Sequence, residues 1–307
     1  MDKKPVIALI YDFDGTLAAG NMQEYDFTKE IGCESAAFWE ENKQMSEANN
    51  ASEILCYMKL MLDKSQNPEN PKPIVKDAFK KYGQNIPLYR GVPEWFDKIN
   101  KYGDSIGVKI EHYINSSGLQ EIIEGTSISN KFEQIYASRF MYDDKKAACW
   151  PAVAVDFTNK TQYLYMINKG INAISQNKQI NNHMDDEDKR IPFSKMIYFG
   201  DGETDVPCMK LLKQEGGYSI AVYQEGNQTQ YDIVKKLINR DIVNFACPAD
   251  YSEGGMIFDA VKAIIHQIKN TDDLEKKQNE NKNNTKNRKP SSYFLTKLQK
   301  KRVRFSR

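Results

Sequence analysis

A continuous apolar run, Val6 to Tyr11, ends abruptly in the acidic segment Asp12-Phe13-Asp14-Gly15. A run of this length and character is typical of a strand that is buried on both faces of a parallel sheet. The polar residues that follow it would then lie in the loop at the carboxyl end of the strand. We therefore expect an active site to begin at Asp12.

Strand-like and helix-like segments alternate along much of the chain, which predicts βαβ units and a parallel sheet. The expected fold is α/β and Rossmann-like, with helices on both faces of the sheet. Residues 18–89 change to helical spacing and predict an inserted helical cap, so that residues 1–17 and 90–270 form the catalytic core. Residues 271–307 are expected to be a disordered basic tail.

Within the core, a strand is expected at residues 108–114, followed by a helix that opens just after Ser116-Ser117-Gly118. Strand-like residues at 132–157 predict a short strand and a β-hairpin. A helix is expected from Thr161 to about Ser175. The last helix of the core is expected at about 256–268, with a short helix near Tyr293 to Gln299 in the tail.

The charge is uneven along the 307 residues. The net charge is +1, but the segment from Lys282 to the end carries ten basic and no acidic residues, which leaves 33 basic and 42 acidic residues in the rest. An acidic body argues against nucleic acid as the main substrate, because nucleic-acid phosphates require a basic surface. The tail could bind RNA or anionic lipid, but solvated disorder is the preferred interpretation.

The longest apolar stretch near the start is far shorter than the ~20 residues of a membrane-spanning helix. No signal peptide is recognisable, because the short apolar run leads into acidic residues. We therefore expect a cytoplasmic protein without a membrane span. The cysteines form no Cys-x-x-Cys pair, so neither a disulfide framework nor a zinc site is predicted for Cys33, Cys56, Cys149, Cys208 and Cys247.

Asp12 and Asp14 could both approach one phosphorus atom if the loop curls around it, and Gly15 would let the backbone come close. Asp12 would attack phosphorus as a carboxylate and form an aspartyl phosphate. Asp14 would protonate the leaving alkoxide and then take a proton from the attacking water. A cation is required to keep the nucleophile ionised beside other carboxylates.

The metal ligands are expected from the segment Gly200-Asp201-Gly202-Glu203-Thr204-Asp205, which follows the strand-like run from Met196 to Gly200. Asp12 and Asp201 are the expected direct ligands, with the backbone carbonyl of Asp14 as a further oxygen. Asp205 would hold a metal-bound water or orient a lysine, whereas Glu203 is expected to point away. Hard oxygen ligands of this kind favour Mg²⁺.

The substrate phosphate is expected to be bound by Ser116 or Ser117 and by a lysine. A serine at the start of a helix can bind phosphoryl oxygens together with backbone amides, although Ser116 could also simply cap the helix. Lys160 precedes a helix and could neutralise the phosphoryl group. The alternative lysine, Lys169, is expected in the middle of that helix.

Taken in order, these segments resemble the four motifs of the haloacid dehalogenase superfamily. Asp12-Phe13-Asp14-Gly15-Thr16 resembles the first motif, Ser116 the second, Lys160 the third, and the segment from Gly200 to Asp205 the fourth. The resemblance covers residues 5–268. Because an acid is present at Asp14, it implies phosphoryl transfer rather than dehalogenation.

The insertion and the hairpin at 132–157 resemble those of the phosphoserine phosphatase branch. That branch carries an early glutamate in the cap, and here the corresponding position is Asn21, with Glu24 three residues later. Near the end of the insertion, Tyr89, Arg90 and Trp95 could contact substrate, although an aromatic residue at such a junction more often belongs to the core.

These observations predict a magnesium-dependent phosphatase that hydrolyses a small phosphomonoester through an aspartyl-phosphate intermediate. One alternative is a phosphotransferase or mutase of the same superfamily, which would pass the phosphoryl group to an alcohol. The other is a non-catalytic binding protein on this scaffold, with the basic tail as its docking element.

Overall fold

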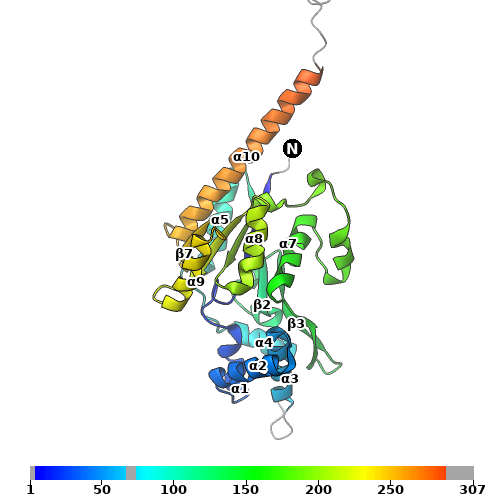
Figure 1. Cartoon of the computed structure of the whole chain (residues 1–307), viewed down its shortest axis with the longest axis vertical. Coiled ribbons are helices and arrows are strands. Elements are labelled where there is room, and N and C mark those ends of the chain that lie inside the picture. Colours follow the sequence, from blue (N-terminus) through cyan, green and yellow to red (C-terminus); the bar gives the residue numbers. More distant parts are fainter. Residues whose placement is uncertain (1–3, 67–73, 288–307) are drawn as a thin grey trace, which may run out of the picture. The chain divides into compact units, whose positions relative to one another are not determined.

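The computed structural model describes residues 4–66 and 74–287 (Figure 1). The chain divides into two compact units, residues 1–265 and residues 266–307. The first unit contains the whole sheet and the inserted helices. The expected helix near Tyr293 to Gln299 lies outside the described residues.

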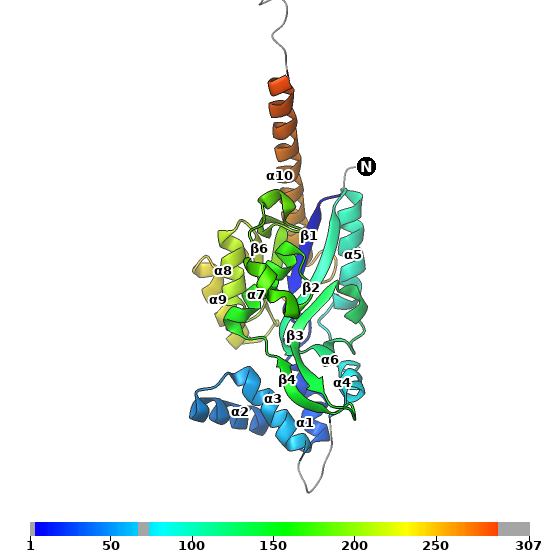
Figure 2. The ribbon, with the colours of Figure 1, turned by 90° about the vertical axis from the view of Figure 1, so that its right-hand side faces the viewer.

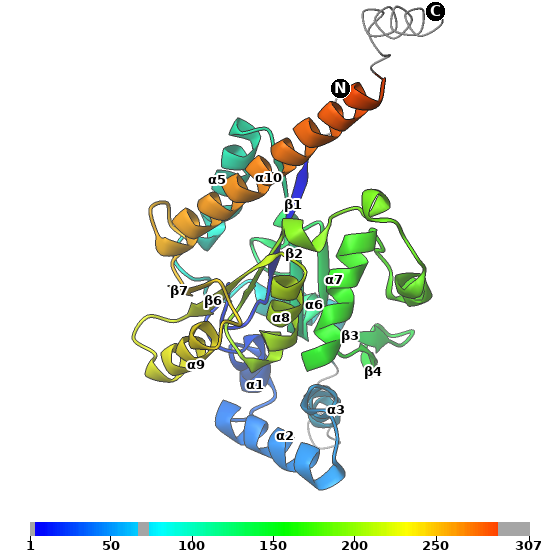
Figure 3. The ribbon, with the colours of Figure 1, turned by 45° about the horizontal axis from the view of Figure 1, so that its top comes forward.

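A seven-stranded sheet has the order β4-β3-β2-β1-β5-β6-β7, with β7 at one edge and β4 at the other (Figure 3). Every neighbouring pair is parallel except β3 and β4, which form an antiparallel hairpin. The strands are β1 (Val6–Tyr11), β2 (Lys109–Leu119), β3 (Gln134–Tyr142), β4 (Ala148–Val153), β5 (Met196–Gly200), β6 (Tyr218–Tyr223) and β7 (Phe245–Pro248). The predicted α/β fold and the predicted hairpin are confirmed.

Strand β1 lies in the middle of the sheet, between β2 and β5. Its Ile10 is paired with Tyr113 on one side and with Tyr198 on the other. Because all three strands run in the same direction, the loops at their carboxyl ends meet at one edge. This order brings together segments that are separated by more than a hundred residues in the sequence.

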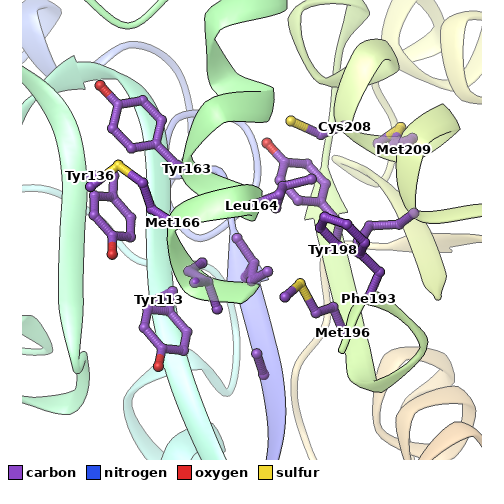
Figure 4. Packing of buried hydrophobic residues seen from close by; sticks show 14 of the residues in the cluster. Tyr113, Tyr136, Tyr163, Leu164, Met166, Phe193, Met196, Tyr198, Cys208 and Met209 are labelled. Carbon is purple, nitrogen blue, oxygen red and sulfur yellow. The ribbon is translucent and has the colours of Figure 1, made fainter. Parts of the chain in front are cut away.

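Helices cover both faces of the sheet (Figure 2). On one face α7 (Lys160–Lys169), α8 (Val206–Gln214) and α9 (Gln228–Asn239) pack over the cluster shown in Figure 4. In this cluster Tyr136 stacks on Tyr163 at a centroid distance of 4.9 Å. On the other face Trp95 packs edge-on against Phe199 and Phe258. The core also contains α5 (Val92–Ser105) and α6 (Gln120–Ile123). Helix α10 (Met256–Asn287) begins in the first unit and continues into the second.

The insertion between β1 and α5 is helical, as the spacing predicts. It contains a short 3-10 helix, η1 (Met22–Glu24), and the helices α1 (Phe27–Glu30), α2 (Ser35–Asn49), α3 (Glu53–Ser65) and α4 (Lys76–Gly83). These elements gather beyond the carboxyl ends of the strands (Figure 2). The β3–β4 hairpin reaches the insertion, where Phe140 stacks on Phe79 at 5.7 Å.

Two elements of the core differ from the predicted ones. Strand β2 continues to Leu119, with a register shift between Ser116 and Leu119, and α6 has only four residues. A helix does open just after Gly118, as predicted, but it is a single turn that begins at Gln120. Helix α7 ends at Lys169 because Gly170 adopts a left-handed conformation, with φ of 70°, and a 3-10 segment follows at Ile174–Asn181.

Helix α10 is longer than predicted and continues to Asn287 instead of ending near residue 268. Its sequence loses apolar periodicity after Asp272, and asparagine and lysine are the commonest residues there, but it contains no glycine or proline before Pro290. Because these two strongly helix-breaking residues are missing, the helix can continue without a buried face. The disordered tail predicted from residue 271 is thus wrong for residues 271–287.

Among the described residues, no helix is both long enough and apolar enough to span a bilayer.

Candidate active site

Asp12, Ser116 and Asp201 lie at the carboxyl ends of the three adjacent strands β1, β2 and β5, or directly after them. The backbone amide of Asp12 donates to the carbonyl of Phe199 at 2.9 Å, which ties the first acidic loop to β5. Asp12 is almost completely buried, with 6% of its surface exposed. The sheet order therefore brings together the predicted first, second and fourth motifs.

Lys160 is the first residue of α7, and its side chain is completely buried. Its ammonium nitrogen lies 3.2 Å from Oδ1 of Asp12 and 2.8 Å from Oδ1 of Asp205. The backbone carbonyl of Lys160 accepts a hydrogen bond from the side-chain amide of Asn115 at 3.1 Å. Asn115, which sequence reasoning did not single out, thereby fixes the start of α7 against β2.

Asp205 is fully buried and accepts hydrogen bonds from Lys160 and from a second residue. Its Oδ1 also accepts a hydrogen bond from the Tyr198 hydroxyl at 2.7 Å. A Cβ atom on Gly200 would lie 2.4 Å from the carboxyl carbon of Asp205, so a glycine is required there. Asp205 thus orients Lys160, which is one of the two roles considered for it from the sequence.

The alternative lysine, Lys169, is engaged elsewhere. Its ammonium donates to the backbone carbonyls of Ile180 and Asn182, both at 2.6 Å. These carbonyls belong to the polar connection between α7 and β5. The geometry therefore places Lys160, and not Lys169, beside the acidic residues.

Asp14 connects the core with the insertion. Its Oδ1 accepts a hydrogen bond from the backbone amide of Met22 at 3.0 Å, at the start of η1. The side chain of Met22 in turn lies against Gly118, where a Cβ atom would come within 2.1 Å of its terminal methyl group. The first turn of the insertion is therefore packed against the loops that carry Asp14 and Ser116.

Asp201 approaches the first acidic loop closely. Gly15 adopts a left-handed conformation, with φ of 74°, and a Cβ atom on it would lie 2.0 Å from Oδ2 of Asp201. The Gln230 amide lies 3.4 Å from the same oxygen. Gly15 thus permits the contact between the two acidic loops, as expected for a glycine at this position.

The buried site holds more carboxylates than cations, and the pKa values of Asp12 and Asp201 are raised. Burial raises the pKa of Asp12 to about 6, against the lowering effect of Lys160. Burial, together with the charges of Asp12 and Asp205, holds the pKa of Asp201 well above its ordinary value. Burial tends to lower the pKa of Lys160, but Asp12 and Asp205 overcome this effect and raise it. Additional positive charge would favour the ionised form of these acids.

The acidic residues form a set of oxygen donors that fits a divalent cation. Carboxylate oxygens of Asp12, Asp201 and Asp205 all lie within 4.8 Å of one another. Asp205 already accepts hydrogen bonds from Lys160 and Tyr198. Asp12 and Asp201 are therefore the side chains best placed to coordinate a metal ion. A small set of carboxylates with room for further oxygen ligands suits Mg²⁺.

The two serines at the end of β2 have different surroundings. The Ser116 hydroxyl accepts a hydrogen bond from the backbone amide of Gly118 at 3.1 Å. The Ser117 hydroxyl is buried and has no hydrogen-bond partner among the described residues. Since α6 has only four residues, the predicted contribution of a helix N-terminus to phosphate binding is not supported.

These groups line a cavity of about 470 Å³ between the core and the insertion. The core contributes acids, hydroxyls and the Gln230 amide, and the insertion contributes aromatic and amide side chains together with Glu53. The lining residues are Asp12, Asp14, Gly15, Gly20, Asn21, Gln23, Trp39, Asn42, Glu53, Ile54, Tyr57, Ser116, Ser117, Asp201, Thr204 and Gln230. Glu203, which was expected to point away from the site, is exposed and does not line the cavity.

The residues near the end of the insertion do not line this cavity. Trp95 is fully buried and donates a hydrogen bond to the Tyr11 hydroxyl at 2.8 Å, so it belongs to the core. Arg90 is exposed and lies 3.5 Å from Asp250. The sequence could not reveal Gln23, Asn42 or Gln230, because isolated amides carry no motif.

The sequence model of the haloacid dehalogenase-like hydrolases matches residues 9–210. The chain belongs to this family. The matched region contains all four predicted motif segments, at Asp12, Ser116, Lys160 and Asp201. It also contains the whole insertion, from η1 to α4.

Two solved structures and one sequence relative illustrate the similarity. An uncharacterised protein of Borreliella burgdorferi is 28% identical over 297 residues, which cover 86% of this chain and 98% of that protein. A probable phosphoserine phosphatase from Vibrio cholerae has a TM-score of 0.52 at 12% identity, over 89% of this chain and 67% of that one. A haloacid dehalogenase family hydrolase from Salmonella enterica serovar Typhi has a TM-score of 0.49 at 15% identity, over 80% and 68%. The Vibrio cholerae structure supports the α/β fold of this hydrolase.

Proposed function

We propose that this haloacid dehalogenase-like hydrolase is a magnesium-dependent phosphatase that acts on small phosphomonoesters through a phosphorylated Asp12. The observation that carries the proposal is the arrangement around Lys160. One buried ammonium neutralises Asp12 while Asp205 holds it in place. A buried carboxylate with this support, in a cavity that also contains a second acid, is suited to attack a phosphorus atom.

In the first step, an oxygen of Asp12 attacks phosphorus and the bond from phosphorus to the substrate alcohol breaks. Asp14 donates a proton to the leaving oxygen, so that the alcohol departs neutral. Burial, followed by the charge of Asp12, holds the pKa of Asp14 well above its ordinary value, which is the protonation state that this step needs. The product of this step is an aspartyl phosphate at Asp12 and a free alcohol.

In the second step, a water molecule attacks the phosphorus of the aspartyl phosphate, and Asp14 takes a proton from that water. The bond from phosphorus to Asp12 breaks, inorganic phosphate forms, and the carboxylate of Asp12 is restored. Asp14 alternates between acid and base, and its hydrogen bond from Met22 keeps it at the junction with the insertion. No other proton donor is required to complete the cycle.

The remaining residues bind and neutralise the phosphoryl group. Ser116 and Ser117 would donate hydroxyl hydrogen bonds to its oxygens, and Lys160 would offset charge that develops as the bonds change. Asp12, Asp201 and the backbone carbonyl of Asp14 would hold Mg²⁺. When bound, the ion supplies positive charge to the phosphoryl oxygens and to the ionised nucleophile.

The insertion supplies the reason to favour small substrates. Its helices cover the carboxyl edge of the sheet, and the cavity between them and the core has a volume of about 470 Å³. A cavity of this size fits a small organic phosphate and excludes a folded phosphoprotein. It also limits access of bulk water to the reacting groups.

The test is phosphate release from p-nitrophenyl phosphate with and without Mg²⁺, for the wild-type protein and Asp12→Asn. We expect magnesium-dependent turnover in the wild type and at least a thousandfold lower kcat in the variant, on the order of the loss seen when nucleophiles are removed. Asp104→Asn is a matched control, because Asp104 is exposed and forms a surface ion pair with Lys4, away from the cavity. Equal rates in Asp12→Asn and the wild type would refute the proposal.

A further inference from the structure

The cavity contains carboxylates but no basic side chain among the described residues that line it. Asp12, Asp14 and Asp201 face it from the core, and Glu53 faces it from the start of α3. Lys160 is fully buried behind Asp12 and is not part of the lining. Lys160 and the proposed Mg²⁺ offset the charges of Asp12 and Asp201, and Asp14 is protonated for the first step. Glu53 therefore remains as a carboxylate without a cationic partner in the lining.

This charge distribution bears on what the leaving group can carry. A phosphorylated amino acid or hydroxy acid brings a carboxylate beside its phosphate, and that carboxylate would need a cationic partner. The lining offers none among the described residues and adds the like charge of Glu53 instead. A leaving group with a positive charge, in contrast, would be attracted by Glu53.

The insertion also presents a buried hydrogen-bond acceptor at the cavity. Gln23 lines the cavity from η1, and its side-chain oxygen is buried and has no partner among the described residues. Only 2% of the Gln23 surface is exposed.

Helix α2 supplies a second acceptor of the same kind. Only Phe38 and Asn42 are buried among its fifteen residues. Asn42 is 4% exposed and lines the cavity, and its side-chain oxygen also has no partner among the described residues. Buried polar atoms without a partner are rare in proteins and call for an explanation, such as a bound ligand.

A primary ammonium group satisfies both features at once. It carries a positive charge and three N–H donors and has no acceptor. Two of these donors would match the oxygens of Gln23 and Asn42, and the charge would be offset by Glu53. A neutral hydroxyl could donate to one oxygen but would leave the charge of Glu53 unbalanced.

Building on the phosphatase function proposed above, we propose that the preferred substrates are phosphomonoesters of amino alcohols, which carry an ammonium group and lack a carboxylate. Gln23 and Asn42 would be the specificity-determining residues. Glu53 would contribute attraction at longer range. The cation would be recognised by the insertion while the phosphate lies at Asp12.

Four esters separate the possibilities when hydrolysed by the full chain with Mg²⁺. O-Phosphoethanolamine carries the ammonium, O-phosphoserine adds a carboxylate, and 2-hydroxyethyl phosphate replaces the ammonium with a hydroxyl. p-Nitrophenyl phosphate reports on the chemistry alone. We expect kcat/KM for O-phosphoethanolamine to exceed that for the two matched esters by about tenfold or more, the scale of discrimination that paired polar groups produce.

Two variants test the residues. Gln23→Met removes the acceptor at similar volume, and we expect kcat/KM for O-phosphoethanolamine to fall about tenfold. Asn42→Lys introduces a cation, and we expect the preference to shift from O-phosphoethanolamine toward O-phosphoserine. Gln44→Met is the matched control. Gln44 lies on the exposed side of α2, the helix that carries Asn42, and its side chain donates a hydrogen bond to Glu40.

The outcomes distinguish this inference from the function on which it rests. If none of the four esters is hydrolysed, the proposed phosphatase function fails and the inference fails with it. If p-nitrophenyl phosphate is hydrolysed but O-phosphoserine equals or exceeds O-phosphoethanolamine, the inference is wrong and the phosphatase function stands. Equal hydrolysis of 2-hydroxyethyl phosphate and O-phosphoethanolamine would likewise overturn the role of the ammonium group.

Discussion

The ammonium nitrogen of Lys160 lies 2.8 Å from Oδ1 of Asp205, and both side chains are completely buried. Such a pair is stable only if each charge keeps its partner, because an unpaired charge in the interior is strongly unfavourable. Lys160 also lies 3.2 Å from Asp12, so one cation serves two carboxylates. The stability of the core and the state of Asp12 therefore depend on the same lysine.

Lys160→Met should lower the free energy of unfolding by about 3–5 kcal/mol, because it leaves two buried carboxylates without a cation. It should also abolish phosphate release. Chemical denaturation at neutral pH measures the first effect, and a phosphate assay measures the second.

Lys169→Met is the natural comparison for Lys160→Met, since Lys169 only bonds two backbone carbonyls. We expect a loss of about 1–2 kcal/mol, in the range of hydrogen bonds to a charged group, with phosphatase activity retained. Loss of activity in Lys169→Met, with full activity in Lys160→Met, would contradict the assignment of Lys160.

Gly15→Ala should impair activity through a contact with Asp201. The new Cβ would lie 2.0 Å from Oδ2 of Asp201, so the carboxylate has to move. We expect kcat/KM to fall at least about a hundredfold, as is typical when a group at the reacting centre moves by 1 Å. We also expect half-maximal activity to require more Mg²⁺.

Gly107→Ala controls for backbone strain in that experiment. Gly107 has φ of 78°, close to the 74° of Gly15, but a Cβ atom there would meet nothing within 4 Å. Both variants should lose about 1–2 kcal/mol of stability from the left-handed conformation. If Gly15→Ala and Gly107→Ala had the same activity, the close approach of Gly15 to Asp201 would have no functional importance.

His112 should make the protein less stable in mild acid. Burial lowers the pKa of its imidazole to about 3, and its ring nitrogens lie 3.0 Å from the Tyr11 hydroxyl and 2.9 Å from the Asn100 side-chain oxygen. Trp95 donates to the Tyr11 hydroxyl, so that hydroxyl donates to His112, which is therefore neutral.

Since the unfolded chain binds a proton at His112 below about pH 6.5 and the folded protein does not, stability falls as the pH decreases from 6.5 toward 3. The contribution of His112 should reach about 1.4 kcal/mol per pH unit. His112→Gln should show a flatter dependence of the unfolding free energy between pH 6 and pH 4. An identical slope in the two proteins would show that His112 is not buried as a neutral ring.

Much of the core could be predicted from the sequence because its strands are short apolar runs that end in polar motifs. The run ending at Tyr11 and the run ending at Gly200 are unambiguous, and the sheet order then requires Asp12 and Asp201 to meet. The end of β2 was not predictable, because Ser116 to Leu119 resembles a turn before a helix, whereas pairing with β3 keeps it extended. Tertiary pairing overrides local propensity there.

The cavity wall formed by the insertion could not be predicted. Gln23 and Asn42 become buried only when η1 and α2 fold over the core, and neither the spacing nor the composition of these segments reveals a binding role. The continuation of α10 to Asn287 was not predictable for a different reason. Residues 273–287 lack the apolar periodicity that indicates a helix, yet they contain no glycine or proline that would end one.

The most direct test of the account is to trap the covalent intermediate at Asp12. The protein is mixed with p-nitrophenyl phosphate and Mg²⁺ during steady turnover, treated with borohydride, which reduces an acyl phosphate to an alcohol, and digested for mass spectrometry. The account predicts homoserine in place of Asp12, absent without substrate and absent when Mg²⁺ is removed. Steady turnover with an unmodified Asp12, or with the modification at another acid, would contradict it.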